Sequence, residues 1–368
     1  MNIPFIDLKA QQELIKSDIL NRIENVLAHG RYIMGPEVTE AEAKLADFVG
    51  TKHCITVASG TEALLISLMA INIKPGDEVI TTAFTFAATA EVIALLGAKP
   101  VFVDIDPKTC NIDTNQIKEA ISNKTKAIIP VSLYGQPSDM DEINSIVAGT
   151  EIKVIEDAAQ SLGSIYKGKN SGNLSHIGCT SFFPSKPLGC YGDGGAIFTN
   201  DEIIAEASRQ IRVHGQSKRY THTRIGVGGR MDTMQCAVVL SKLSLFPDEV
   251  KKRQEIGNYY TKLFSEAPNK HISLIETKSD RTNVFAQYTI RVSDRERMVN
   301  ALKEKGIPTA VHYPIPLNEQ EAYKNISKSF DTTQAKAAAK EVVSLPMHPY
   351  LEKSVQESIV KTVLSVFS

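Results

Sequence analysis

Residues 54–200 alternate short apolar runs with helical patterns. The strand candidates are CITVAS, DEVITTA, KPVFVDI, KAIIPVSL and KVIEDA, and the helix candidates between them include TEALLISLMAI and TFAATAEVIALLG. Nearly continuous apolar strands separated by helices predict an α/β fold, with a mostly parallel sheet sandwiched by helices. Ligands of such sheets bind beyond the carboxyl ends of the strands, so functional residues are expected in the loops there.

The rest of the chain predicts a smaller second domain. A chain of 368 residues exceeds the size at which a single core usually stops growing. Helical patterns dominate after residue 200, and Pro247 is expected to kink or break the longest of them. The strand candidates FAQYTIRVS and TAVHY then alternate with the helix candidates RERMVNALKEKG, TTQAKAAAKEVV and SVQESIVKTVLSVF. We therefore predict a large domain at residues 1–245 and a small C-terminal α+β domain at residues 246–368.

Composition argues against several classes of partner. The 41 basic and 42 acidic residues leave a net charge of -1, which provides no broad attraction for nucleic acid or an anionic membrane. The five cysteines contain no CxxC pair, so neither a disulfide framework nor a metal site is expected. The first residues do not form a signal peptide, and no run of about eighteen apolar residues follows. A cytoplasmic protein without a membrane segment is the expectation.

Two residues suit the chemistry of pyridoxal phosphate. Asp157 ends the strand candidate KVIED, and Lys186 lies in the turn SFFPSKPLG between two apolar runs. A pyridoxal enzyme needs an amine that bonds to the cofactor and a carboxylate that keeps the pyridine nitrogen protonated. Taken singly, each residue has a plainer interpretation: a lysine on a turn is usually solvated, and an aspartate after a strand usually caps a helix.

A phosphate site is predicted where CITVAS runs into Ser59-Gly60-Thr61-Glu62 and a helix begins. Glycine lets the backbone approach closely, and the amides and dipole of a helix N-terminus favour an anion. The plain alternative is an ordinary serine or threonine helix cap.

Taken together, SGTEA, TFAAT, EDAAQS and SFFPSKPLGCYGDGGA occur in an order that resembles the DegT/DnrJ/EryC1/StrS family of sugar aminotransferases. The resemblance covers nearly the whole chain and implies the type I fold of pyridoxal-dependent transferases. It assigns Lys186 to the covalent bond with the cofactor and to proton transfer, and Asp157 to the pyridine nitrogen. The other cofactor contacts that it implies are Gly60, Thr61, Glu62, Phe86, Gln160 and Ser181. For Phe86, a buried helix aromatic is the alternative.

The lysine at position 186 bears on the reaction. Family members that became dehydratases carry histidine there, so the resemblance favours transamination, with L-glutamate as the expected amino donor. Lys186 must lose its proton to act, and a lowered pKa is therefore expected.

The resemblance also implies a homodimer with shared active sites. One position departs from the family pattern, since relatives read GxNxR where residues 226–230 read Gly-Val-Gly-Gly-Arg. In relatives that asparagine reaches the phosphate bound by the neighbouring subunit, and here Gly228 replaces it. A backbone amide of Gly228 could substitute for the lost contact.

Substrate choice is predicted from a basic segment and from two loops. Residues 212–230 contain Arg212, His214, Lys218, Arg219, His222, Arg224 and Arg230, which suits an anionic ligand, although a solvated interface loop explains them as well. The sequence of this segment resembles that of the subgroup that aminates UDP-2-acetamido-2-deoxy-3-oxo-glucuronic acid. This resemblance indicates O-antigen and lipopolysaccharide synthesis. The predicted substrate contacts are Arg31, Tyr32, Met34, His214, Arg230, His312 and Tyr313. A structural role for His312 is the alternative.

Other functions remain open at this point. The ketone could be at C4 and the nucleotide UDP or dTDP. A pyridoxal-dependent sugar dehydratase and a non-catalytic regulator that keeps the fold are further alternatives. A dinucleotide-binding oxidoreductase shares the α/β alternation, but CITVASGTEA lacks its GxGxxG turn.

Overall fold

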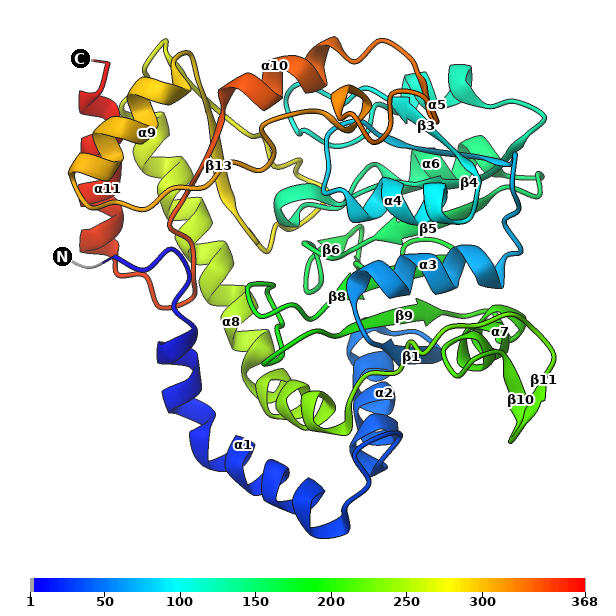
Figure 1. Ribbon diagram of the computed structural model, residues 1–368. Helices are drawn as coiled ribbons and strands as arrows, with labels where there is room; N and C mark the ends of the chain where they lie inside the picture. The colour runs from blue at the N-terminus through cyan, green and yellow to red at the C-terminus, as the bar shows by residue number, and fades with distance from the viewer. Residues whose placement is uncertain (1–2, 368) are drawn as a thin grey trace.

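The computed structural model describes residues 3–367, and an eight-stranded sheet forms its centre (Figure 1). In spatial order its strands are β1 (His53–Val57), β9 (Gly195–Thr199), β8 (Ile177–Ser181), β5 (Lys153–Asp157), β4 (Thr125–Ile129), β2 (Glu78–Thr82), β3 (Lys99–Val103) and β14 (Lys328–Ser329). Strand β9 runs antiparallel to both neighbours, and the other pairs are parallel. The predicted α/β fold with a mostly parallel sheet is confirmed.

Helices cover both faces of this sheet because its strands are apolar on both sides. On one face, α3 (Gly60–Ala70), α4 (Ala88–Leu95) and α7 (Glu202–Ile211) pack on side chains such as Ile55 and Val79. On the other face, α2 (Pro36–Val49) packs on Cys54, and α5 (Thr114–Ala120) and α6 (Met140–Val147) pack on Ile80 and its neighbours. Burial on both faces explains why these strands read as near-continuous apolar runs.

Two long helices connect the sheet to the C-terminal part of the chain. Helix α1 (Leu8–His29) packs along α8 (Thr233–Glu266), which crosses the molecule (Figure 1). Pro247 does not break the helix, because α8 continues through it, and a kink at Pro247 stays a prediction. Phe246 of α8 still belongs to the core beside the sheet, whereas Ile256 belongs to the C-terminal core. The predicted boundary at residue 245 therefore falls inside a helix that both cores share, and the domain division stays a prediction.

The C-terminal core is built on a small antiparallel sheet. Its strands are β12 (Ile272–Leu274), β13 (Tyr288–Val292) and β15 (Val342–Leu345), and α9 (Arg295–Glu304) and α11 (Lys353–Ser365) pack on them. Three details differ from the sequence expectations. TAVHY is no strand and makes a single bridge at Ala310, Val342 begins a strand rather than ending α10 (Thr333–Glu341), and β14 extends the large sheet by pairing with β3.

Short elements complete the description. They are the hairpins β6 (Ile165–Tyr166) with β7 (Lys169–Asn170) and β10 (Gln216–Lys218) with β11 (Thr221–His222), and the 3-10 turns η1 (Leu133–Gly135) and η2 (Leu317–Glu319). Across residues 3–367, every helix is too short or too polar to cross a bilayer.

Candidate active site

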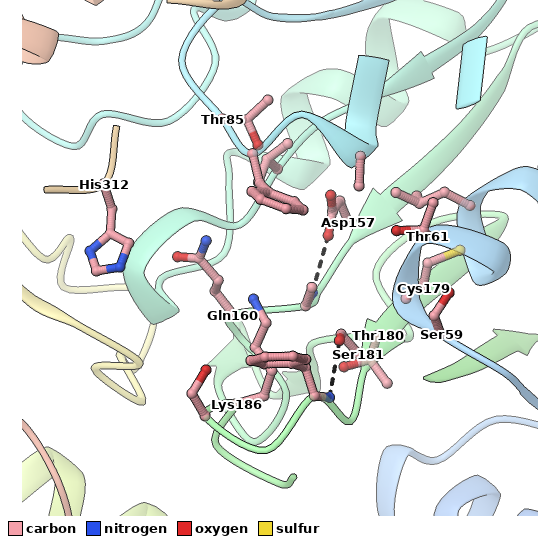
Figure 2. Close-up of a pocket in the computed structure, with 18 of the residues that line it drawn as sticks. Ser59, Thr61, Thr85, Asp157, Gln160, Cys179, Thr180, Ser181, Lys186 and His312 are labelled. Atoms are coloured by element: carbon pink, nitrogen blue, oxygen red, sulfur yellow. Dashed lines mark hydrogen bonds between the residues drawn. The ribbon is translucent and has the colours of Figure 1, made fainter. Parts of the chain in front are cut away.

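A cavity of about 490 Å³ opens where β5 and β8 end, as expected for a sheet of this class. Asp157 is the last residue of β5 and Ser181 the last of β8, so both project from the carboxyl edge of the sheet. The start of α3, the loop before α4 and the turn at residues 312–313 complete the walls. Figure 2 shows these groups facing one another around the cavity.

Asp157 is buried and has hydrogen-bond donors on both carboxylate oxygens. Thr89 Oγ1 donates to Oδ2 at 2.9 Å, and the amide of Ala159 donates to Oδ1 at 3.2 Å. Burial raises the pKa of Asp157, while these two donors and the nearby Lys186 amine oppose the rise. A cation placed against this carboxylate would favour its ionised form further.

Lys186 lines the same cavity from the loop between β8 and β9, and its side chain points toward the centre (Figure 2). Burial lowers the pKa of Lys186, and the attraction of Asp157 only partly opposes this effect. A neutral amine is a nucleophile and a base, whereas an ammonium group is neither. The plain alternative of a solvated surface lysine is therefore wrong.

The start of α3 forms an anion cradle at one end of the cavity. Ser59 caps the helix by accepting a hydrogen bond from the amide of Glu62 at 3.0 Å, so the plain cap interpretation is correct for this residue. The amides of Gly60 and Thr61 have no acceptor in the part of the chain that the structure describes. A Cβ atom at Gly60 would lie 2.6 Å from that of Ser181, so glycine is what allows these loops to meet. Two free amides at a helix N-terminus suit a phosphate group.

Phe86 and Gln160 stand at the sides of the cavity. Phe86 is 55% exposed and precedes α4, so it is not a buried helix aromatic. Its ring is free to contact a flat ligand. Gln160 is buried, accepts a hydrogen bond from the amide of Tyr134 at 2.8 Å, and donates to the hydroxyl of Tyr313 at 3.2 Å.

The C-terminal part of the chain supplies the opposite wall with His312 and Tyr313. The hydroxyl of Tyr134 donates to the carbonyl oxygen of His312, and His312 Nδ1 lies 2.9 Å from Ser344 Oγ. Burial lowers the pKa of His312 to about 4, and the positive charge of Lys186 adds to this effect. At neutral pH this wall is uncharged. His312 therefore has a structural contact on one ring edge and also lines the cavity, and its contact with the substrate stays a prediction.

The remaining predicted contacts lie outside the cavity within this one chain. Glu62 has a buried Oε2 that finds no donor among residues 3–367, and it packs against Gly229, near the charge of Arg230. The others outside the cavity lining are Arg31, Tyr32, Met34, His214, Gly228 and Arg230. All of them are exposed except Arg230, which is half-buried and whose Nε atom has no hydrogen-bond partner in the described part of the chain. Their roles in binding stay predictions.

Arg212 does not belong to an exposed basic patch. Its side chain is buried, pairs with the carboxylate of Glu42, and donates to the carbonyl oxygen of Thr56 at 2.8 Å. It therefore joins α2 to β1 and is unavailable to an anionic ligand. The other basic residues of the segment, at positions 214–224, are exposed around the β10–β11 hairpin.

Several residues of the site escaped the sequence analysis. Thr89, the last residue of TFAAT, donates a hydrogen bond to Asp157, whereas the sequence pattern indicates only Phe86 of this motif as a cofactor contact. Gln287 lines the cavity, and the buried Tyr134 supports it from behind through its hydrogen bond to Gln160. Both residues come from segments that are distant in sequence, and no local pattern identifies them. Among residues 3–367 there is no group of three side chains able to hold a metal ion.

Comparison with known proteins identifies the relatives of this chain. The model of the DegT/DnrJ/EryC1/StrS aminotransferase family matches residues 13–364. The chain belongs to this family. UDP-2-acetamido-2-deoxy-3-oxo-D-glucuronate aminotransferase of Pseudomonas aeruginosa is 55% identical over 95% of this chain and 96% of its own length. A pleiotropic regulatory protein of Geobacillus stearothermophilus is 44% identical over 100% of this chain and 99% of its own.

A solved structure extends the comparison to the cofactor. NtdA of Bacillus subtilis, crystallised with bound cofactor PMP, has a TM-score of 0.92 and 30% identity, and the match covers 100% of this chain and 85% of NtdA. The chain is thus an aminotransferase dependent on pyridoxal phosphate, and the resemblance noted in the sequence is confirmed. Its residues fit that group, because an anion cradle, a buried carboxylate and an amine of lowered pKa surround one cavity.

Proposed function

We propose that this aminotransferase moves an amino group from L-glutamate to the C3 ketone of UDP-2-acetamido-2-deoxy-3-oxo-glucuronic acid. The observation that supports this substrate is the 55% identity, over 95% of the chain, to the Pseudomonas aeruginosa enzyme named for it. On this proposal the protein acts in the cytoplasm and supplies an amino sugar for O-antigen and lipopolysaccharide synthesis. A UDP- or dTDP-linked 4-keto sugar is the alternative substrate.

The two catalytic residues have separate tasks in this proposal. Pyridoxal phosphate, when bound, supplies an electron-withdrawing ring that stabilises negative charge on the reacting carbon. Lys186 Nζ would hold the cofactor, and its unprotonated amine would move a proton from the reacting carbon of the substrate and back. Asp157 would keep the pyridine nitrogen protonated. The lowered pKa of Lys186 and the buried position of Asp157 support these roles.

The cofactor contacts follow from the positions around the cavity. We assign the phosphate to Gly60, Thr61 and Ser181, and the face of the ring to Phe86. Gln160, which also lines the cavity, would hold the side of the ring. Glu62 lies outside the cavity lining, and its amide is bonded to the Ser59 side chain, so we expect it to support the start of α3 rather than to contact the cofactor.

A homodimer with shared sites is part of the proposal. Tyr32, Ile33 and Met34 are exposed apolar residues beside α1, which itself exposes Leu14 and Leu20. Apolar surface of this extent suits a subunit interface. The second subunit would bring the segment containing His214, Gly228 and Arg230, together with Arg31, to a cavity whose own lining has Lys186 as its one strong cation.

An absorption measurement tests the proposal. Purified protein is loaded with pyridoxal phosphate, treated with glutamate, and then supplied with the 3-keto uronate or a 4-keto sugar. We expect glutamate to abolish the visible band of the bound cofactor and only the 3-keto uronate to restore it. Restoration by the 4-keto sugar alone would refute the substrate assignment. An unchanged spectrum after glutamate would favour a dehydratase or a regulator.

A further inference from the structure

Gln287 carries a buried acceptor that the catalytic roles above do not use. The residue lines the cavity beside His312 and Tyr313, immediately before β13. Its Oε1 atom is shielded from solvent and has no hydrogen-bond donor within residues 3–367. A buried polar atom without a partner lowers stability, so its presence in a native site calls for an explanation. A hydrogen-bond donor on a ligand bound in the cavity would explain it, by pairing with Oε1.

The backbone before Gln287 is fixed, so the side chain is held at the cavity. The amide of Val284 donates to the carbonyl oxygen of Gly135 at 3.0 Å, and Asn283 Oδ1 accepts from the amide of Phe285 at 2.7 Å. The chain passes so close to Gly135 that a Cβ there would lie 2.6 Å from the Phe285 nitrogen. From Tyr288 onward, the strand pairs with β15. A fixed backbone makes an oriented side chain a precise hydrogen-bonding group.

The C-terminal residues that line the cavity together with Gln287 are polar and uncharged at neutral pH. Burial lowers the pKa of His312 to about 4, which leaves the ring neutral at physiological pH, and Ser344 lies 2.9 Å from its Nδ1 atom. The Tyr313 hydroxyl already accepts a hydrogen bond from Gln160. Such a wall does not attract a carboxylate or a phosphate, which need cationic partners or several amides. It suits a neutral part of a sugar.

We propose that Gln287 determines sugar specificity, with its Oε1 accepting a hydrogen bond from an uncharged N–H or O–H donor on the sugar. The inference rests on the proposed nucleotide-sugar function and adds the residue that recognises the sugar substituent. An acylamido N–H and a ring hydroxyl share the required chemistry. Gln287 makes no covalent step and does not touch the cofactor in this role.

Binding of the UDP-linked 3-amino acetamido uronate to the cofactor-loaded enzyme tests this role by calorimetry. Gln287→Leu removes the acceptor, and we expect its Kd to rise about 10-fold or more. Gln287→Glu keeps an acceptor oxygen and removes the donor group, so it should bind more tightly than the leucine variant. Gln320→Leu is a matched control, because Gln320 lies outside the cavity lining and should leave the Kd unchanged.

A sugar without any substituent at C2 distinguishes the two donors. If the effect of Gln287→Leu disappears with this sugar, the acylamido N–H is the donor; if it persists, a ring hydroxyl is. The inference is wrong if Gln287→Leu binds every sugar as the wild type does, or if Gln287→Glu binds more weakly than Gln287→Leu. The cofactor band tests the proposed function separately, because glutamate should abolish it equally in wild type and Gln287→Leu.

Discussion

The two walls of the cavity are built in different ways. The wall from the large sheet uses the ends of β5 and β8 and the start of α3, and it carries the ionisable pair Asp157 and Lys186. The C-terminal wall uses a turn and the residue before β13, and its groups His312, Tyr313 and Gln287 are uncharged at neutral pH. The difference suggests a division of labour, with bond-making chemistry on the sheet side and sugar recognition on the other.

This division has a physical reason. Charged groups at the carboxyl edge of a parallel sheet are held by rigid strands, and each carboxylate oxygen of Asp157 accepts one hydrogen bond that orients it there. A turn is easier to vary without disturbing the sheet, so it suits substrate choice. Substitutions on the two walls should therefore affect different kinetic constants.

The largest effect is expected for Lys186→Ala. Removing the amine removes both the covalent link and the base, so turnover should fall by about 10⁴-fold or more. The sugar Kd should remain within a few-fold of wild type, because the C-terminal wall is unchanged. Steady-state rates and calorimetry on the same preparation provide both numbers. Retained transamination would remove Lys186 from the mechanism.

Asp157→Asn should give the next largest effect. The amide keeps the shape, and the Thr89 hydroxyl can rotate to accept its N–H, but the negative charge is lost. We expect kcat to fall by about 100-fold, as for the loss of one strong electrostatic contact.

Glu156→Gln is the matched control for Asp157→Asn. Glu156 neighbours Asp157 on β5 but faces away from the cavity, where Ser171 Oγ donates to it at 2.6 Å. Its rate should stay within a few-fold of wild type. Equal losses in the two variants would mean that the strand, rather than the charge of Asp157, supports catalysis.

The sheet wall was largely predictable because its residues lie in short local patterns. Strand β5 appears as an apolar run that ends in Asp157, and Lys186 and Gly60 each follow a strand within a few residues. Gly60 and Thr61 line the cavity, and their binding of the cofactor stays a prediction. Glu62 lies outside the lining, because its side chain packs beside Gly229, near Arg230.

The C-terminal wall was less predictable because long-range contacts create it. Gln287 meets the cavity only after β13 pairs with β15, and Tyr134 contacts His312 across 178 positions of sequence. Strand β14 has two residues, so it exists only through its pairing with β3. Such elements have no hydrophobic period of their own, and local propensity cannot identify them.

Tyr134→Phe should produce a smaller effect, on the C-terminal wall alone. The variant loses the hydrogen bond from the tyrosine hydroxyl to the carbonyl oxygen of His312 and keeps the ring in its buried position. One neutral hydrogen bond contributes about 1 kcal/mol, so the KM for the sugar should rise about 5-fold. The rate of the glutamate half-reaction should not change. An altered glutamate rate with an unaltered sugar KM would contradict the division between the walls.

The smallest effect is expected for pH acting on His312. Burial lowers its pKa from 6.5 to about 4, so the ring is neutral throughout the range from pH 5 to 8. The sugar KM of the wild type should therefore not change with pH through His312 in that range, so His312→Gln should have the same pH profile of KM.

The effect of His312 on stability has a definite direction, because the unfolded ring binds a proton near pH 6.5 and the folded ring does not. Protonation of His312 therefore does not lower the free energy of unfolding above pH 6.5, and it lowers this free energy progressively as the pH falls from 6.5 toward 4. Chemical denaturation at several pH values should give His312→Gln a shallower loss than wild type over that interval. A KM titration near pH 6.5 that disappears in His312→Gln would show that the ring is charged at the site and that this wall is not neutral.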